Sequence, residues 1–168
     1  MFLELIVLPR VLRGLLEEVD EGAAAGLALD FAEQCIRDTG AGVVPAGLAE
    51  TAIGYLAAAR AHLGGGGMAE LASAHQRYFD ARDHADQLPA VITWIAVIAV
   101  RVACQRDMEA AGVVARVRHV PTVAGVADEA QAIAGLAAGK GDDGHRARWE
   151  AARRQLVLLI SAVPVPGS

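Results

Sequence analysis

The residues best suited to chemistry in this sequence form a group of histidine, tyrosine and aspartate side chains between positions 75 and 86. In a helix, Asp80 and His84 share one face because they are four positions apart. A carboxylate and an imidazole at that spacing can ligate a metal ion, or can pair a general base with the group that orients it. His75, Asp80 and His84 are therefore the candidate residues for a metal site or an enzyme active site. The group also holds Tyr78, Asp83 and Asp86.

The same residues have a structural interpretation, which we favour. A bound metal would need further ligands from another helix, and the sequence contains no HExxH or ExxH pattern to supply them. Asp80, Asp83 and Asp86 would then form a solvated acidic face, and His75 would lie at the edge of the core with its ring hydrogen-bonded. We accordingly predict no catalytic residue, no metal and no cofactor.

A second polar group, formed by acidic residues, directly follows the leucines at positions 12, 15 and 16. It can be the hydrophilic end of an amphipathic helix, or a negative patch that meets a basic protein, since complementary charge speeds association and excludes wrong partners. Together with the aspartates at 80, 83 and 86, it supplies the candidate partner-binding residues. The acidic group itself is Glu17, Glu18, Asp20 and Glu21.

Other reaction classes have no signal in the sequence. Cys35 and Cys104 are the only cysteines, they form no CxxC pair, and they are expected to be reduced thiols. The four glycines at 64–67 lack the lysine of a phosphate-binding loop, and there is no GxSxG motif around any serine.

Charge and hydropathy narrow the class of partner and the location. A net charge of −5 disfavours nucleic acid, whose binding normally rests on a basic surface. The most hydrophobic stretch, Leu88–Val100, is about 13 residues long, whereas a membrane-spanning helix needs about 20. Met1–Leu8 carries Glu4 and no preceding basic stretch, so it does not resemble a secretory signal and is expected to be a docked terminal segment. We expect a cytoplasmic protein with no membrane partner.

Helices must position these residues. The chain is 54% hydrophobic but only 4% aromatic, and its many alanines favour closely packed helices. Prolines 9, 45, 89 and 121 suit helix starts, while glycines 40, 64 and 139 suit helix ends. Apolar residues between them recur three and four positions apart. The predicted helices are 9–20, 23–38, 46–63, 68–87, 90–111, 122–138 and 144–162.

The expected fold is all-α: a bundle of about seven helices, mostly antiparallel hairpins around a central helix at 90–111. That helix is apolar around most of its circumference and so needs partners on several sides. We expect a single domain over 1–162, in which Gly64–Gly67 joins two antiparallel helices. Asp142 and Asp143 offer an N-cap to the last helix, and residues 163–168 form a tail.

One family resemblance can be stated on these residues. Residues 49–63, an alanine-rich helix, lead through the glycine joint into 69–75, which ends in an Ala-His step and is followed by Ala81-Arg82. This pattern resembles the core of the bacterial putative immunity protein family, and the likeness extends weakly to Trp94–Ala103 and Arg148–Arg153. The chain departs from the family in its branched aliphatic helix at 88–100 and in the glycines at 64–67. The resemblance implies an all-helical protein that neutralises a bacterial toxin by binding it, and it brings no catalytic residues.

Three hypotheses about function follow. The leading one is a non-enzymatic helical module that binds another protein, of the immunity type, through its acidic helices. The second is a metal-binding or small-ligand-binding protein, or an enzyme, that uses His75, Asp80 and His84. The third is a self-associating structural module in which exposed faces of the helix at 90–111 pair between subunits.

Overall fold

The described part of the chain is entirely helical apart from turns and loops. The computed structural model describes residues 2–162, with side chains from Val7 onward, and this range contains seven helices and no strand. The predicted all-α bundle is therefore confirmed, while the predicted tail at 163–168 lies outside the described residues. The helices are α1 (Phe2–Glu17), α2 (Glu21–Gly40), α3 (Ala46–Leu63), α4 (Met68–Arg82), α5 (Gln87–Ala110), α6 (Val123–Ala138) and α7 (Asp142–Ala162).

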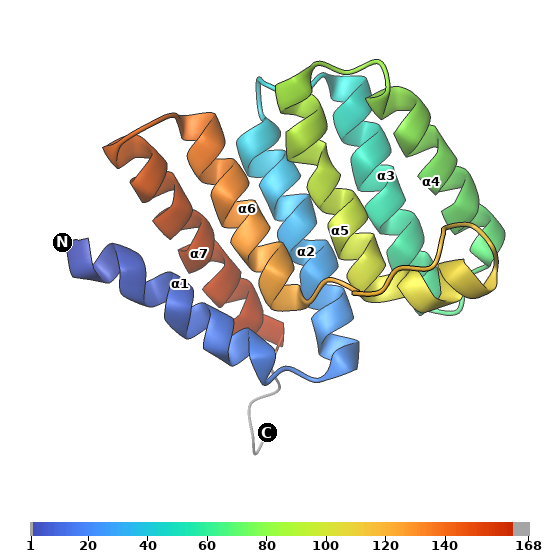
Figure 1. The fold of residues 1–168 in the computed structure, drawn as a ribbon, viewed down its shortest axis with the longest axis horizontal. Helices are drawn as coiled ribbons and strands as arrows, with labels where there is room; N and C mark the ends of the chain where they lie inside the picture. The colour runs from blue at the N-terminus through green and yellow to red at the C-terminus, as the bar shows by residue number, and fades with distance from the viewer. Residues whose placement is uncertain (1, 163–168) are drawn as a thin grey trace.

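The helices pack as a strip two layers thick (Figure 1). One layer contains α1, α6, α5 and α4 in that order, and the other contains α7, α2 and α3. Each helix of the second layer packs between two helices of the first, so the order along the strip is α1, α7, α6, α2, α5, α3, α4. The two end helices, α1 and α4, are consequently covered on one side only.

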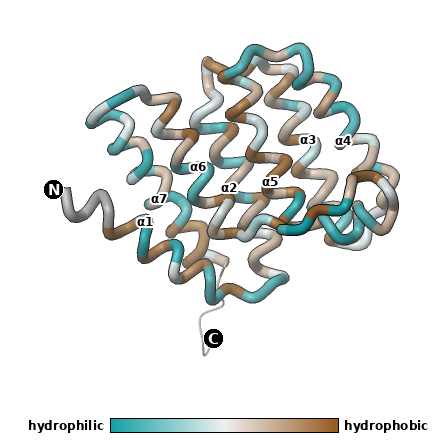
Figure 2. The backbone as a smooth tube through the Cα atoms, viewed as in Figure 1, coloured by the Kyte–Doolittle hydropathy of each residue, from teal (hydrophilic) through white to brown (hydrophobic). Residues whose placement is uncertain are grey.

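Helix α5 lies at the centre of the strip, as its apolar circumference predicts. It contacts α2 and α3 in the other layer and α4 and α6 in its own. Ile92, Ile95 and Val100 are completely buried. Figure 2 shows hydrophobic residues along this helix and hydrophilic ones at the turn between α4 and α5. Branched side chains of this size fill the space that the surrounding alanines leave.

Helix α5 also has the length and hydropathy of a membrane span. Among the described residues it is the one helix that meets both criteria, and half of its most apolar window is buried inside the protein. The core helix of a folded bundle meets the same criteria. The expectation that no membrane is involved stays a prediction.

The prediction that a helix starts at Pro9 is wrong. Helix α1 begins at Phe2, so Pro9 is inside it, and residues 2–8 of the segment expected to dock form its first turns. A proline in a helix interior removes one backbone hydrogen bond and costs about 3 kcal/mol. Leu12 and Leu16, one turn apart, are buried on the same side of α1, and their burial against α6 and α7 offsets that cost.

Other helix boundaries also differ from prediction, and two of these differences change the role of named residues. Helix α4 ends at Arg82 instead of continuing to 87, and α5 begins at Gln87, so that Pro89 lies in the first turn, where a missing N–H costs nothing. Helix α7 begins at Asp142, two residues early. Asp142 and Asp143 thus lie in its first turn, near the positive end of the helix dipole, and do not precede it as a cap.

Candidate binding cleft

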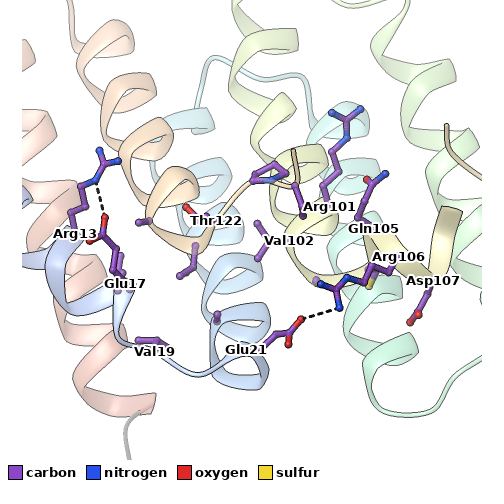
Figure 3. A pocket seen from close by; sticks show the side chains of 18 residues that line it. Arg13, Glu17, Val19, Glu21, Arg101, Val102, Gln105, Arg106, Asp107 and Thr122 are labelled. Atoms are coloured by element: carbon purple, nitrogen blue, oxygen red, sulfur yellow. Dashed lines mark hydrogen bonds and ion pairs between the residues drawn. The ribbon is translucent and has the colours of Figure 1, made fainter. Parts of the chain in front are cut away.

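The structure has an open cleft of about 650 Å³. It lies between the turn that joins α1 to α2, the C-terminal half of α5 and the segment that leads into α6 (Figure 3). Ligand-binding clefts commonly have volumes of about 300–1,000 Å³. The cleft is therefore large enough to receive a small molecule or several side chains of another protein.

Three separate elements contribute hydrophobic residues to the lining of the cleft. Leu16 and Val19 come from the end of α1 and the turn after it, Val102 from α5, and Val120 and Val123 from the entry to α6. Val120 is 43% exposed. An open apolar surface of this kind favours contact with another apolar group.

Cys104 also lines the cleft, but its thiol is not set up as a nucleophile. The side chain is buried, and its Sγ donates a weak hydrogen bond to the carbonyl oxygen of Ala59 at 3.9 Å. Burial, with a smaller contribution from Asp107, raises the pKa of Cys104 to about 11. Burial likewise raises the pKa of Cys35 to about 12. Both thiols are thus protonated at neutral pH, and both cysteines are free.

The rim of the cleft carries charges of both signs, and most of them are paired. Arg13 pairs with Glu17 at 3.4 Å, and Arg106 approaches Glu21 at 3.8 Å. Asp107 accepts from Nε2 of His62 at 2.9 Å. Exposed pairs such as these contribute about 0–1 kcal/mol each. They can therefore open or exchange partners at low cost when something binds.

One wall of the cleft is the segment between α5 and α6, and two side chains of α5 hold it in place. Glu109 accepts hydrogen bonds from Nε2 of Gln105 at 2.6 Å and from the backbone N–H of Val117 at 3.0 Å. These two hydrogen bonds lower the pKa of the Glu109 carboxyl group. Gln105 also donates to the carbonyl oxygen of Ala115 at 3.3 Å. The segment is thereby fixed along residues 115–117, just before it reaches the cleft at Val120.

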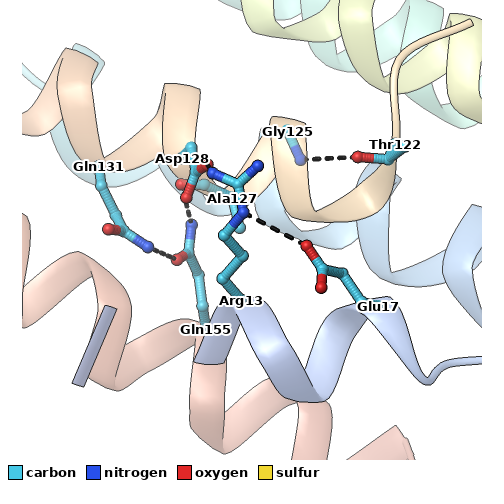
Figure 4. Close-up of polar contacts among 8 residues, drawn as sticks. All are labelled: Arg13, Glu17, Thr122, Gly125, Ala127, Asp128, Gln131 and Gln155. Atoms are coloured by element: carbon cyan, nitrogen blue, oxygen red, sulfur yellow. Dashed lines mark hydrogen bonds and ion pairs between the residues drawn. The ribbon is translucent and has the colours of Figure 1, made fainter. Parts of the chain in front are cut away.

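The opposite wall is fixed to α6. Arg13 of α1 donates to Asp128 of α6 at 2.7 Å, and the Thr122 hydroxyl caps α6 by accepting from the N–H of Gly125 at 3.1 Å (Figure 4). The cleft is thus built on helix ends whose positions are set by specific contacts.

The structure divides the predicted partner-binding residues into two separate groups. Glu17 and Glu21 line the cleft. Asp20 caps α2, accepting from the N–H of Ala23 at 3.0 Å, and Glu18 is exposed between these residues. The predicted acidic patch is therefore next to the cleft, but Arg13 and Arg106 partly neutralise it.

The other acidic candidates lie at the turn between α4 and α5, at the opposite end of the helices (Figure 1). Asp83 and Asp86 are exposed, and Asp86 precedes α5 without a side-chain capping hydrogen bond. Asp80 accepts from Nε2 of Gln76 at 2.8 Å. These residues form the solvated acidic face of the favoured interpretation, and none of them lines the cleft.

His75, Asp80 and His84 do not come together. His84 bonds through Nδ1 to the backbone oxygen of Asp80, and His75 faces another helix, with its Nδ1 2.8 Å from the hydroxyl oxygen of Tyr55. Among the side chains described, which begin at Val7, no group of three or more histidine, cysteine, aspartate or glutamate residues is arranged to hold a metal ion. The prediction that the His75 ring is hydrogen-bonded at the core edge is confirmed.

The contact between His75 and Tyr55 belongs to an aromatic cluster between α3, α4 and α5. Tyr55 stacks on Tyr78, and Phe79 meets Trp94 edge to face. The guanidinium carbon of Arg82 lies 4.6 Å from the Trp94 ring centre and that of Arg101 lies 5.9 Å from it. Burial, followed by the charge of Arg101, lowers the pKa of His75. The ring is therefore a neutral packing element.

Sequence reasoning did not identify Val102, Gln105 or Val120 as site residues. Val102 and Val120 are ordinary apolar residues in the sequence, and only the packing of α1 against α6 and α7 brings the first inter-helix turn beside them. Gln105 gave a signal that could have been used, because it lies three residues before the buried Met108 and directly after the buried Cys104. A polar residue on a buried face needs a partner, and that requirement points to a functional position.

Residues 49–63 and 69–75 carry the resemblance to the immunity protein family, which stays a prediction. The structure places these residues in α3 and α4, which form an antiparallel hairpin across the glycine joint. Such a hairpin is common to many helical proteins and does not identify one family. A comparison with protein-family models, curated proteins and solved structures finds no match for this chain.

Proposed function

We propose that this chain is a non-enzymatic protein-binding module, and that a segment of a partner protein docks in the cleft beside the turn between α1 and α2. The observation that carries the proposal is that apolar side chains and paired charges line the same cleft. Protein interfaces have this arrangement, in which an apolar centre supplies the binding energy and a polar rim supplies orientation and specificity.

The acidic residues have a defined part in this proposal. Glu17 and Glu21 are each paired with an arginine at the rim, through contacts of 3.4 Å and 3.8 Å, and their side chains are largely exposed. A basic residue of the partner can approach either carboxylate without desolvating a buried charge. The net charge of −5 favours such a partner over an acidic one.

The class of partner is proposed from the family resemblance alone. That resemblance makes the partner a bacterial toxin, the chain its immunity protein and the bacterial cytoplasm the place where the two meet. Neutralisation would then be steric, because the chain needs only to cover the functional surface of the toxin.

The proposal is tested with two substitutions, one at the cleft and one away from it, at valines whose side chains are similarly exposed. Val120 lies at the cleft and is 43% exposed, whereas Val43 lies in the turn between α2 and α3 and is 40% exposed. The tagged protein is co-expressed with the products of neighbouring genes, and the captured proteins are quantified for the wild type, Val120→Glu and Val43→Glu.

We expect at least one protein to be captured equally by the wild type and Val43→Glu, and to be lost with Val120→Glu. A glutamate at the cleft places a charge on the apolar contact, whereas at position 43 it remains in solvent. Capture that is the same with all three proteins, or no capture at all, would overturn the proposal.

Self-association is a second candidate function, because exposed apolar residues gather on α1 and α7. Val7, Val11 and Leu15 are about half exposed and form a stripe along α1, and Val157 and Ile160 are still more exposed on α7. The two helices are neighbours at one end of the strip. Sequence reasoning placed such pairing on the helix at 90–111, whose apolar residues are instead mostly covered by four other helices.

Light scattering tests this second candidate. A dimer that dissociates in Val11→Glu but persists in Val43→Glu would support pairing through α1, whereas a monomer in the wild type would exclude it.

A further inference from the structure

The two sides of the cleft carry charges that are mostly of opposite sign. The end of α1 and the start of α2 contribute Glu17 and Glu21 on one side, and α5 contributes Arg101 and Arg106 on the other (Figure 3). Arg13 also lines the acidic side, but its guanidinium is held by an aspartate of α6 at 2.7 Å. A ligand in the cleft therefore meets carboxylates on one side and guanidinium groups on the other.

The acidic residues on the α5 side are already engaged and leave the arginines there largely uncompensated. Asp107 accepts from Nε2 of His62 at 2.9 Å. The Glu109 carboxylate accepts two hydrogen bonds from within the protein, and its contact with Arg116 is 4.0 Å long. Arg116 is 92% exposed, so this contact hardly restrains it.

The arginines on this side are open to a ligand. Arg106 is 87% exposed, and its contact with Glu21, which crosses the mouth of the cleft, is 3.8 Å long. Arg118 is exposed two residues before Val120, and Arg101 is partly exposed. Neither Arg101 nor Arg118 forms an ion pair with any side chain that the structure describes. Their guanidinium groups can therefore bind an anionic group that arrives from solvent.

We infer that the partner segment that docks in the cleft is of mixed charge, with an acidic residue facing the arginines of the α5 side and a basic residue facing Glu17 and Glu21. The inference rests on the proposed function and specifies the chemistry of its partner. Guanidinium groups bind carboxylates through paired hydrogen bonds, which adds direction to the attraction of the charges. A segment docked the other way round would place like charges together, so the two sides of the cleft fix its orientation.

Ligands of a single charge fit the cleft less well. A uniformly basic segment would meet Arg101 and Arg106, and a uniformly acidic one would meet Glu17 and Glu21. A nucleic acid backbone, which is negative along its whole length, has the same conflict with the glutamates. The net charge of −5 describes the whole chain and not the α5 side of the cleft.

Two small probes of opposite charge test the inference. Hexanoate and hexylammonium have apolar tails of similar size, and each is titrated at low salt into the ¹⁵N-labelled full chain. We expect both tails to shift the backbone signals of Val102 and Val120, which line the cleft. Hexanoate should in addition shift the signals around Arg106 and Arg118, and hexylammonium those from residue 17 to residue 21. In 1 M NaCl this difference should disappear, because salt screens exposed charges.

Charge-neutral variants supply the second measurement. The double variant Arg106→Gln and Arg118→Gln should weaken hexanoate binding about threefold or more and should not weaken hexylammonium binding. The double variant Glu17→Gln and Glu21→Gln should have the reverse effect. Arg146→Gln is the control, because it neutralises an exposed arginine of α7 outside the cleft and should leave both affinities unchanged. All these side chains are exposed, so the substitutions leave the core intact.

The inference would be overturned if only one probe, or neither, bound at the cleft, or if both shifted the same charged residues. It would also be overturned if the arginine variant weakened hexanoate no more than Arg146→Gln does. The capture experiment with Val120→Glu and Val43→Glu uses neither probe, so a failure of the mixed-charge inference and a failure of the docking proposal are distinguishable.

Discussion

Gln131 of α6 donates a hydrogen bond to Gln155 of α7, with 2.8 Å between Nε2 and Oε1, and both side chains are buried (Figure 4). Gln155 in turn donates from its own Nε2 to the carbonyl oxygen of Ala127 at 3.1 Å. The two amides thus form a short chain of hydrogen bonds inside an interface made largely of alanines. Such a chain fixes the register of α7 on α6, because a shift of one residue would leave both amides unsatisfied.

Replacing both glutamines should lower the free energy of unfolding by less than the sum of the losses caused by replacing each one alone. We expect Gln155→Leu to lower the free energy of unfolding by about 2 kcal/mol, since it leaves the buried amide of Gln131 without its acceptor. In the double variant with Gln131→Leu, no orphaned amide remains, so the loss should be smaller than the sum of the two single losses. Urea unfolding of the four proteins measures this coupling, and strictly additive losses would contradict it.

The helices could be predicted from the sequence because each one has a local signature. Helix α3 has the predicted bounds at both ends, where Pro45 precedes it and Gly64 follows it. Helix α5 was predicted at the centre because its apolar residues surround the whole helix, which only a position between several neighbours can satisfy.

The cleft could not be predicted in the same way, because no local signature produces it. The cleft depends on the position of α1, which packs against α6 and α7 although both are far from α1 in the sequence. Helix α1 does not pack against α2, the helix that follows it in the chain. The start of α1 was predicted wrongly because proline usually marks the first turn of a helix. The sequence does not show whether burial of Leu12 and Leu16 outweighs the backbone hydrogen bond that Pro9 removes inside the helix.

Pro9 gives a direct test of that balance. Pro9→Ala restores a backbone donor inside α1 and removes the steric conflict of the ring with the preceding turn, so it should raise the free energy of unfolding by up to about 3 kcal/mol. Pro45→Ala is the control, because Pro45 lies at the N-cap of α3, where no helical hydrogen bond from its nitrogen is needed. Thermal unfolding compares the two, and equal changes would show that Pro9 carries no such cost.

His75 should make the stability depend on pH in the mildly acidic range. Burial and the charge of Arg101 lower its pKa in the folded protein, whereas in the unfolded chain it titrates near its ordinary value of about 6.5. As the pH falls below about 6.5, the unfolded state takes up a proton that the folded state does not bind until a lower pH. The free energy of unfolding should therefore decrease over that interval.

The measurement is a series of urea unfolding curves between neutral pH and the acidic range. His75→Gln should flatten the slope there, since the glutamine has no charge to desolvate. His145→Gln changes an exposed histidine of α7 and should keep the wild-type slope. An unchanged slope in His75→Gln would assign the pH dependence to other groups.

Gly144 is required by a close backbone approach at the start of α7. A Cβ at this position would collide with the carbonyl oxygen of Gly139 and lie 3.2 Å from that of Gly135, and both are backbone atoms that cannot rotate away. Gly144→Ala should therefore lower the free energy of unfolding by about 1–3 kcal/mol, the range for overpacked positions. Gly26→Ala in α2 has the opposite expectation, because a Cβ there meets nothing within 4 Å and the substitution removes the entropic cost of a glycine inside a helix. Its expected gain is about 0.5–1 kcal/mol. If thermal unfolding showed Gly144→Ala to be as stable as Gly26→Ala, the packing of α7 against the end of α6 would have to be looser than the distances around Gly144 indicate.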